Sequence, residues 1–157
     1  STHCLGNHHY YSGTDEERKL DFQSSLDSPD VRAILCARGG YGSVRLIDQL
    51  NWSTFKENPK WIIGFSDITV FHHIIHSMGI QSIHGTMPLN FKENTNEALE
   101  TLLMSLRGEP FKIQCDGNNR NKEGAAKGAL IGGNLSIIYS LLSSPYAFEC
   151  KNKILFI

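Results

Sequence analysis

The sequence has no long apolar run and almost no net charge. None of its apolar segments approaches the ~18 residues that a membrane-spanning helix requires, and the first residues do not have the pattern of a signal peptide. Its 15 Lys and Arg against 16 Asp and Glu give a formal net charge of −1, which argues against the basic surface of a nucleic-acid-binding protein. We therefore expect neither a membrane nor a nucleic acid as partner.

The sequence also lacks paired cysteines. Its four cysteines are far apart, and none belongs to a C-x-x-C motif: Cys4, Cys36, Cys115 and Cys150. A small secreted domain held together by disulfides would have a denser set. The spacing favours four reduced thiols in a cytoplasmic protein. Cys36 lies within an apolar run, so we expect it to be a buried small hydrophobic residue.

What remains is the composition of an ordinary folded protein. The 157 residues are 40% hydrophobic and 20% charged, which is typical of a globular chain of about one domain of ~150 residues. The last residues, 153–157, form an apolar run typical of a strand, with no turn or partner strand after it. Because the chain also starts at Ser1, we expect it to be a piece of a longer protein.

Short apolar runs alternate with amphipathic segments along the chain. A first helix begins at 14–17, where Thr14 and Glu17 have the spacing of a capping box, and ends at 27–30. The other predicted helices are 44–50, 68–78, 94–106 and 135–142, and the predicted strands are 31–37, 61–65, 80–84 and 154–157, the first of them buried. This alternation predicts an α/β fold with a mostly parallel sheet flanked by helices. Residues 115–128 are polar and rich in glycine, as in an interdomain linker or a surface loop.

Ser66 stands where an apolar strand meets an amphipathic helix, within the sequence Gly-Phe-Ser-Asp at 64–67. A tight turn at such a junction can lift a serine hydroxyl above the sheet as a nucleophile, and the backbone N–H groups of the following helix suit a developing oxyanion. The match to G-x-S-x-G is incomplete, because Ile68 replaces the second glycine. The alternative is that Ser66 only caps the helix.

A glycine turn, Arg-Gly-Gly-Tyr-Gly at 38–42, follows the preceding strand. It matches neither G-x-G-x-x-G nor a Walker loop, so by itself it is a tight turn or an anion site. The carboxyl ends of parallel strands lie at one edge of a sheet, so the turn and Ser66 should lie at the same edge. The N–H of Gly39 or Gly40 and that of Asp67 would then be two oxyanion donors.

Three histidines, His72, His73 and His76, fall on one predicted helix. His72 and His76 are one turn apart, a spacing that can hold a metal, but the glutamate of an H-E-x-x-H motif is absent. We therefore expect a partly exposed helix surface and no metal. His84 ends the third strand, where it either lines the site or packs in the interior.

Four segments together resemble the LD-carboxypeptidase family, which includes the murein tetrapeptide carboxypeptidases and the microcin-immunity hydrolases. They are AILCARGGYGSVRLIDQL at 33–50, IIGFSDIT at 62–69, SIHGTM at 82–87 and GALIGGNLSIIYSLLSSPY at 128–146. The resemblance covers nearly the whole chain, in the same order and spacing. One departure is Thr86, where many members have proline.

The resemblance implies a serine peptidase with two domains and a Ser-Glu-His triad. Ser66 would be the nucleophile, the N–H groups of Gly39, Gly40 and Asp67 would form the oxyanion hole, and Arg38, Tyr41 and His84 would bind substrate. The triad's glutamate and histidine would lie beyond residue 157. Residues 1–114 would be the nucleophile domain without its first strand–helix unit. Residues 115–128 would be the linker, and 129–157 the beginning of a second, β-rich or α/β domain.

The substrate implied by the resemblance is a muropeptide tetrapeptide in the bacterial cytoplasm, cleaved during cell-wall recycling to release its terminal D-alanine. No cofactor is expected, and a homodimer is an expectation from the family alone. Two alternatives stay open: a microcin-immunity-like hydrolase of peptidyl-nucleotides, and a non-catalytic α/β module that binds an anion at 38–42. Without the other two triad residues, residues 1–157 by themselves should have negligible hydrolase activity.

Overall fold

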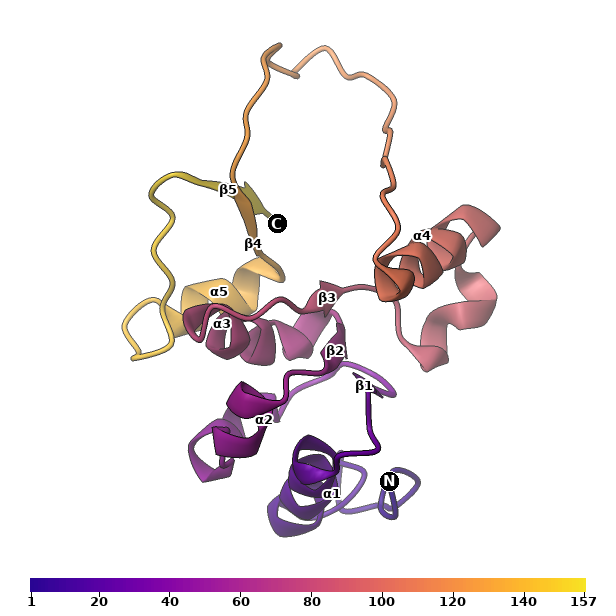
Figure 1. The fold of residues 1–157 in the computed structure, drawn as a ribbon, viewed down its shortest axis with the longest axis vertical. Coiled ribbons are helices and arrows are strands. Elements are labelled where there is room, and N and C mark those ends of the chain that lie inside the picture. Colours follow the sequence, from indigo (N-terminus) through magenta and orange to yellow (C-terminus); the bar gives the residue numbers. More distant parts are fainter.

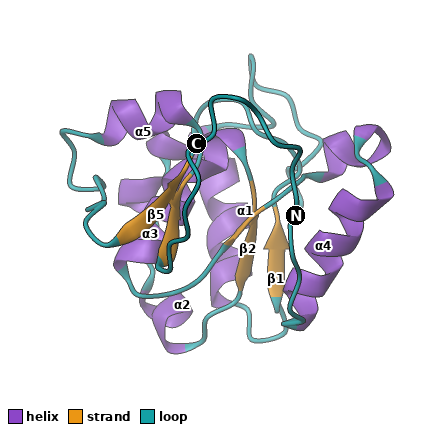
Figure 2. Cartoon of the chain, turned by 90° about the horizontal axis from the view of Figure 1, so that it is seen from above, coloured by secondary structure: helices purple, strands orange, loops and turns teal.

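The structure, a computed structural model, describes residues 1–157 and has an α/β fold, as predicted. Three parallel strands form one sheet in the order β1-β2-β3: β1 (Ala33–Leu35), β2 (Trp61–Gly64) and β3 (Ile83–His84). A second parallel pair consists of β4 (Ala129–Gly132) and β5 (Lys153–Phe156). The α-helices are α1 (Asp15–Asp27), α2 (Ser53–Glu57), α3 (Thr69–Ser77), α4 (Asn96–Arg107) and α5 (Leu135–Leu141). Helix α4 lies on one side of β1 and β2, and α3 lies on the other, beside β5 (Figures 1 and 2).

Both ends of α1 are held by side chains. The N–H of Thr14 donates to the Glu17 carboxylate at 2.7 Å, and the N–H of Glu17 donates to the Thr14 hydroxyl at 3.2 Å, which confirms the capping box. At the other end, the buried Lys60 ammonium donates to the carbonyl oxygens of Ser25 and Ser28 at 3.0 and 2.7 Å. A cation at a helix C-terminus is favourable, because the last carbonyls carry partial negative charge.

Helix α3 is the centre of the hydrophobic core. All of its residues from Thr69 to Ile75 are buried, because β2, β3, α5 and β4 pack around it. On the α1 side, Phe22 stacks on Phe71 with ring centroids 4.6 Å apart, and Trp52 lies edge-on to Phe55. Burying one such ring contributes about 1.5–3 kcal/mol, so the helix that follows Ser66 is among the most firmly held elements.

Strand β1 is shorter and more exposed than predicted. It has three residues in place of the predicted 31–37, and Ala33 and Leu35 are exposed. The prediction of a buried strand was wrong because β1 pairs only with β2 and lies at the edge of the sheet. Cys36, directly after it, is only partly buried, but it packs against the core, and burial raises the pKa of its thiol to about 12. The other three cysteines are exposed free thiols.

The predicted helix 44–50 is also different. Two 3-10 turns, Ser43–Arg45 and Ile47–Gln49, replace it, with hydrogen bonds between residues three apart. Neither turn has a capping side chain to extend it into an α-helix. The short helix α2 lies within 51–59, where neither a helix nor a strand was predicted.

Of the remaining elements, the predicted strand 80–84 is shorter, only Ile83–His84, and β4 was not predicted, whereas the other helices and strands are close to those observed. Helix α4 and helix α5 begin behind the side-chain caps Thr95 and Asn134, and α4 ends at Gly108 in the left-handed conformation. Residues 108–128 contain no helix or strand and form the open arch between α4 and β4 (Figure 1). None of the helices is both long and apolar enough to cross a lipid bilayer.

Candidate active site

Ser66 lies in a strained turn between β2 and α3. Its φ of +59° is in the left-handed region, which few residues other than glycine adopt. Such strain persists only where the surrounding structure enforces it, and it is often found at active sites. Ile68, which replaces the second glycine of the elbow motif, is buried against Gly64: a methyl group on Gly64 would lie 2.8 Å from it. The missing glycine therefore does not prevent the turn.

The glycine turn lies directly against Ser66. A methyl group on Gly39 would lie 3.0 Å from the Ser66 Cβ and 3.3 Å from its Oγ. Gly40 and Gly42 have φ values of +130° and +125°, which side-chain-bearing residues rarely adopt. The two turns therefore meet at one sheet edge, as the parallel-strand argument predicted.

A buried carboxylate joins the two turns. Asp67 Oδ2 accepts a hydrogen bond from the backbone N–H of Ser43 at 2.9 Å, and both residues are buried. The sequence interpretation gave Asp67 only a backbone role and missed this one. The signal for it was weak: an acidic residue directly after an apolar strand is as typical of a helix N-terminus as of a buried bond.

A cluster of charged and aromatic side chains supports the glycine turn from the other side. Arg18 lies 4.6 Å over the Tyr11 ring and donates to the Gly42 carbonyl oxygen at 3.4 Å. Asp15 pairs with Arg18 and Arg45, each at 2.5 Å. The hydrogen bond from Arg45 is the main reason that the pKa of Asp15 is lowered. Nothing in the sequence alone placed these residues near Gly42.

The three predicted substrate-binding residues are at the same edge, and all three are exposed. His84 pairs with Gly64 across the β2–β3 ladder, and its ring lies 6.3 Å from that of Phe65. Arg38 is exposed and its Nε donates to the Gly39 carbonyl oxygen at 3.2 Å, and Tyr41 is 63% exposed.

A shallow hollow of about 400 Å³ adjoins the residue before Ser66. Its lining is polar except for one aromatic ring, and consists of Phe65, His84, Gly85, Thr86, Asn90, Glu93 and Asn94. The Asn94 amide donates to the Thr86 hydroxyl at 2.8 Å and to the Asn90 carbonyl oxygen at 2.6 Å. Thr86, which departs from the family pattern, thus takes part in a hydrogen bond that proline could not accept.

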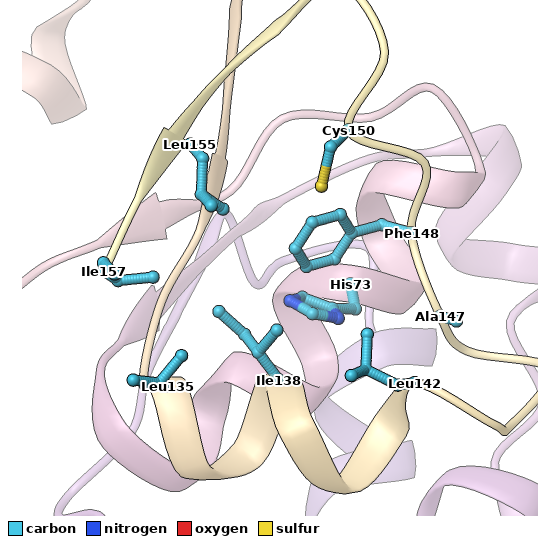
Figure 3. Close-up of a pocket in the computed structure, with 9 residues that line it drawn as sticks. All are labelled: His73, Leu135, Ile138, Leu142, Ala147, Phe148, Cys150, Leu155 and Ile157. Carbon is cyan, nitrogen blue, oxygen red and sulfur yellow. The ribbon is translucent and has the colours of Figure 1, made fainter.

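The prediction of a partly exposed histidine surface on α3 was wrong for His72 and His73, which are 7% and 4% exposed. Both are covered because α3 is enclosed by strands and α5, and burial lowers the pKa of each to about 4. His73 faces an apolar pocket between α5 and β5, edge-on to Phe148 at 4.2 Å (Figure 3). His76 lies 2.9 Å from the Lys153 ammonium. The hydrogen bonds of the histidines go to other partners than the Ser66 hydroxyl.

The segment 129–157 contacts the first turn of α3. The N–H of Asn134 donates to the Thr69 hydroxyl at 3.0 Å, and a methyl group on Gly133 would lie 2.5 Å from the same oxygen. Asn134 also caps α5, with its side chain accepting from the N–H of Ile137. Residues 129–157 therefore contact Thr69, which is three residues after Ser66 in the sequence.

Comparison with known proteins gives matches over most of the chain. Residues 1–85 match the LD-carboxypeptidase N-terminal domain, and residues 127–157 match the LD-carboxypeptidase C-terminal domain. The murein tetrapeptide carboxypeptidase of Pseudomonas aeruginosa is 33% identical over 149 residues, which are 87% of this chain and 48% of that protein. The chain spans about half the length of the curated relatives it matches.

Solved structures share the fold. The muramoyltetrapeptide carboxypeptidase from Oxalobacter formigenes has a TM-score of 0.82 and 24% identity, over 92% of this chain and 50% of that one. An MccF-like protein from Bacillus anthracis has a TM-score of 0.78 and 26% identity, over 95% of this chain and 53% of that one. With the N-terminal family match covering more than half of its residues, the chain belongs to the LD-carboxypeptidase family.

Proposed function

We propose that Ser66 is the nucleophile of a serine carboxypeptidase that cleaves the L,D-peptide bond to the terminal D-alanine of muropeptide tetrapeptides. The observation that carries the proposal is the strained Ser66 turn with Gly39 packed against it. The substrate is supported by the family match and by the relative named murein tetrapeptide carboxypeptidase.

The reaction follows the logic of a serine triad. Ser66 Oγ forms a bond to the carbonyl carbon while its proton passes to a general base. The N–H groups of Asp67 and of Gly39 or Gly40 hold the oxyanion of the tetrahedral intermediate. The carbon–nitrogen bond then breaks, the proton passes to the amine of D-alanine, and water hydrolyses the resulting ester. The glutamate and histidine of the triad are supplied by residues outside 1–157, as the family resemblance implies.

The hollow beside Phe65 suits the part of the peptide that does not react. Its amides, hydroxyl and carboxylate offer hydrogen bonds to peptide groups, and Phe65 offers one apolar wall. Arg38, Tyr41 and His84 would bind substrate around it. In this proposal residues 1–114 form the nucleophile domain, 115–128 the linker and 129–157 the beginning of the second domain. The enzyme acts in the cytoplasm without a cofactor, and dimer formation stays a prediction.

The test is labelling of the full-length protein with a fluorophosphonate, a reagent that reacts with activated serines. We expect an adduct on Ser66 and release of D-alanine from a tetrapeptide. Ser66→Ala should abolish the adduct and lower turnover by about 10⁵-fold or more, because removing the nucleophile disables the whole triad. Unchanged melting of the variant is the control that the protein is still folded. Absence of the adduct in the unmodified protein contradicts the proposal.

One alternative is a hydrolase of peptidyl-nucleotides, and the structural likeness to MccF-like proteins supports it. The same preparation should be offered a tetrapeptide and a peptidyl-nucleotide at equal concentration. Faster turnover of the nucleotide by a protein that still labels at Ser66 would assign the alternative. A protein that binds phosphate at 38–42, takes no label and is unaffected by Ser66→Ala would be the non-catalytic module.

A further inference from the structure

His72 spans the turn that contains Ser66. Its side chain comes back from α3 to the end of β2, where Nε2 lies 2.9 Å from the carbonyl oxygen of Gly64. Its other nitrogen, Nδ1, lies 2.8 Å from the hydroxyl of Ser82. Because a carbonyl oxygen can only accept, Nε2 carries the proton, and Nδ1 accepts from the Ser82 hydroxyl. The two contacts therefore define one neutral tautomer of the ring.

The Gly64 carbonyl is a point where three elements meet. It accepts from His72 on α3 and also from the N–H of Gly85, at 3.2 Å, just after β3. Gly64 is the last residue of β2 and precedes Ser66 by two residues. The direction in which the chain leaves the strand is thus fixed from both sides. Only one residue, the extended Phe65, separates this anchored carbonyl from Ser66 with its positive φ.

The next residue on the helix offers an internal comparison. His73 is as deeply buried as His72, yet its ring nitrogens make no hydrogen bond of normal geometry and only face the backbone of Tyr146 and Gly132. Its ring lines the apolar pocket and lies edge-on to Phe148 (Figure 3). His73 therefore fills space, whereas the two nitrogens of His72 are bonded to the last residue of β2 and to the residue before β3.

From this contrast we propose that His72 is a positioning residue for Ser66: its Nε2–H holds the Gly64 carbonyl, and with it the turn that presents the nucleophile. The proposal rests on the proposed function, since it takes Ser66 to be the nucleophile. His72 does not touch the reacting atoms. It acts by fixing backbone geometry, to which reaction rates are sensitive because a displacement of about 1 Å can cost ~100-fold.

The test compares His72→Leu, His72→Gln and His73→Leu in the full-length protein. His72→Leu removes both bonds, whereas the glutamine amide can still donate to Gly64 and accept from Ser82. We expect His72→Leu to lower kcat, with little change in KM, and the rate of fluorophosphonate labelling at Ser66, each by about 10- to 100-fold. His72→Gln should recover most of both. His73→Leu should leave kcat and the labelling rate within about threefold of the unmodified protein, even if it lowers the melting temperature as much as His72→Leu does.

Two results would overturn the proposal. One is a His72→Leu protein that folds and labels at the unmodified rate, and the other is an equal loss of labelling in His73→Leu, which would mean that any buried change suffices. If His72→Leu does not fold, two other measurements test the proposal: the labelling rate of Ser82→Ala, and the ¹⁵N chemical shifts of the His72 ring in the unmodified protein. Nε2 must carry the proton, and Ser82→Ala must slow labelling. Failure of the unmodified protein to label at all would instead contradict the proposed function.

Discussion

The region around Ser66 and the region 129–157 differ in how firmly they are packed. Within 61–75, the strand β2 and helix α3 are almost wholly buried, and Ile62 and Ile75 are completely so. Within 129–157, many large apolar side chains are exposed: Leu130, Leu135, Tyr139, Leu142, Phe156 and Ile157. The difference indicates that stability and the Ser66 turn depend on the first region, and that the second is held mainly by its contacts with α3.

The largest difference should appear when one apolar side chain is truncated in each region. Ile62→Ala removes a side chain that has no exposed surface, and should lower the free energy of unfolding by about 2–5 kcal/mol. Leu130→Ala removes a side chain that is 66% exposed, and should cost under about 1 kcal/mol. Urea unfolding followed by circular dichroism measures both. Similar losses for the two variants would show that the second region is more integral to the fold than its exposure indicates.

A smaller effect is expected on activity when a methyl group is added beside Ser66. The Cβ of Gly39→Ala would lie 3.0 Å from the Ser66 Cβ, tighter than nine in ten Cβ contacts in proteins, so the serine or the turn must shift by a few tenths of an ångström. We expect fluorophosphonate labelling to fall by about 100-fold with little loss of stability. Gly117→Ala is the matched control, because no atom lies within 4 Å of the added methyl. If Gly39→Ala is labelled at the unmodified rate, the close packing of the glycine turn is not needed for the reactivity of Ser66.

Much of the first region could be predicted because its signals are local. The strand 61–65 and the helix that follows it were predicted from an apolar run and an amphipathic repeat. The capping-box spacing of Thr14 and Glu17 likewise predicted the start of α1. Parallel pairing then places Gly39 beside Ser66. For these elements, the residue types and their spacing within a short stretch of sequence were enough to predict the structure.

The contacts that could not be predicted all join residues distant in the sequence. The Asp67 bond to Ser43 spans 24 residues, and the salt bridge of Arg45 to Asp15 spans 30. The burial of His72 and His73 was missed for the same reason. A helix of nine residues shows which face is apolar, but not that strands and α5 cover its other faces. The edge position of β1, which exposes Leu35, is likewise a property of the sheet and not of the strand.

The smallest effect concerns the bond that connects the two regions. Thr69→Val keeps the shape of a completely buried side chain but removes the hydroxyl that accepts from the Asn134 N–H. We expect a loss of about 1 kcal/mol in the free energy of unfolding, the usual value of one hydrogen bond. Hydrogen exchange should rise in residues 129–157 and remain unchanged in α1. Thr101→Val is the matched control, because the Thr101 hydroxyl bonds only within its own helix, to the Ala98 carbonyl oxygen.

An unchanged exchange pattern in Thr69→Val would mean that apolar contacts with α3, rather than this bond, hold residues 129–157 in place. Faster exchange in those residues together with slower fluorophosphonate labelling would show that the two regions are coupled. Because Thr69 lies three residues after Ser66, the turn would then depend on the docked segment as well as on the core. The two regions, which differ in burial, would in that case contribute to one active site through a single buried hydroxyl.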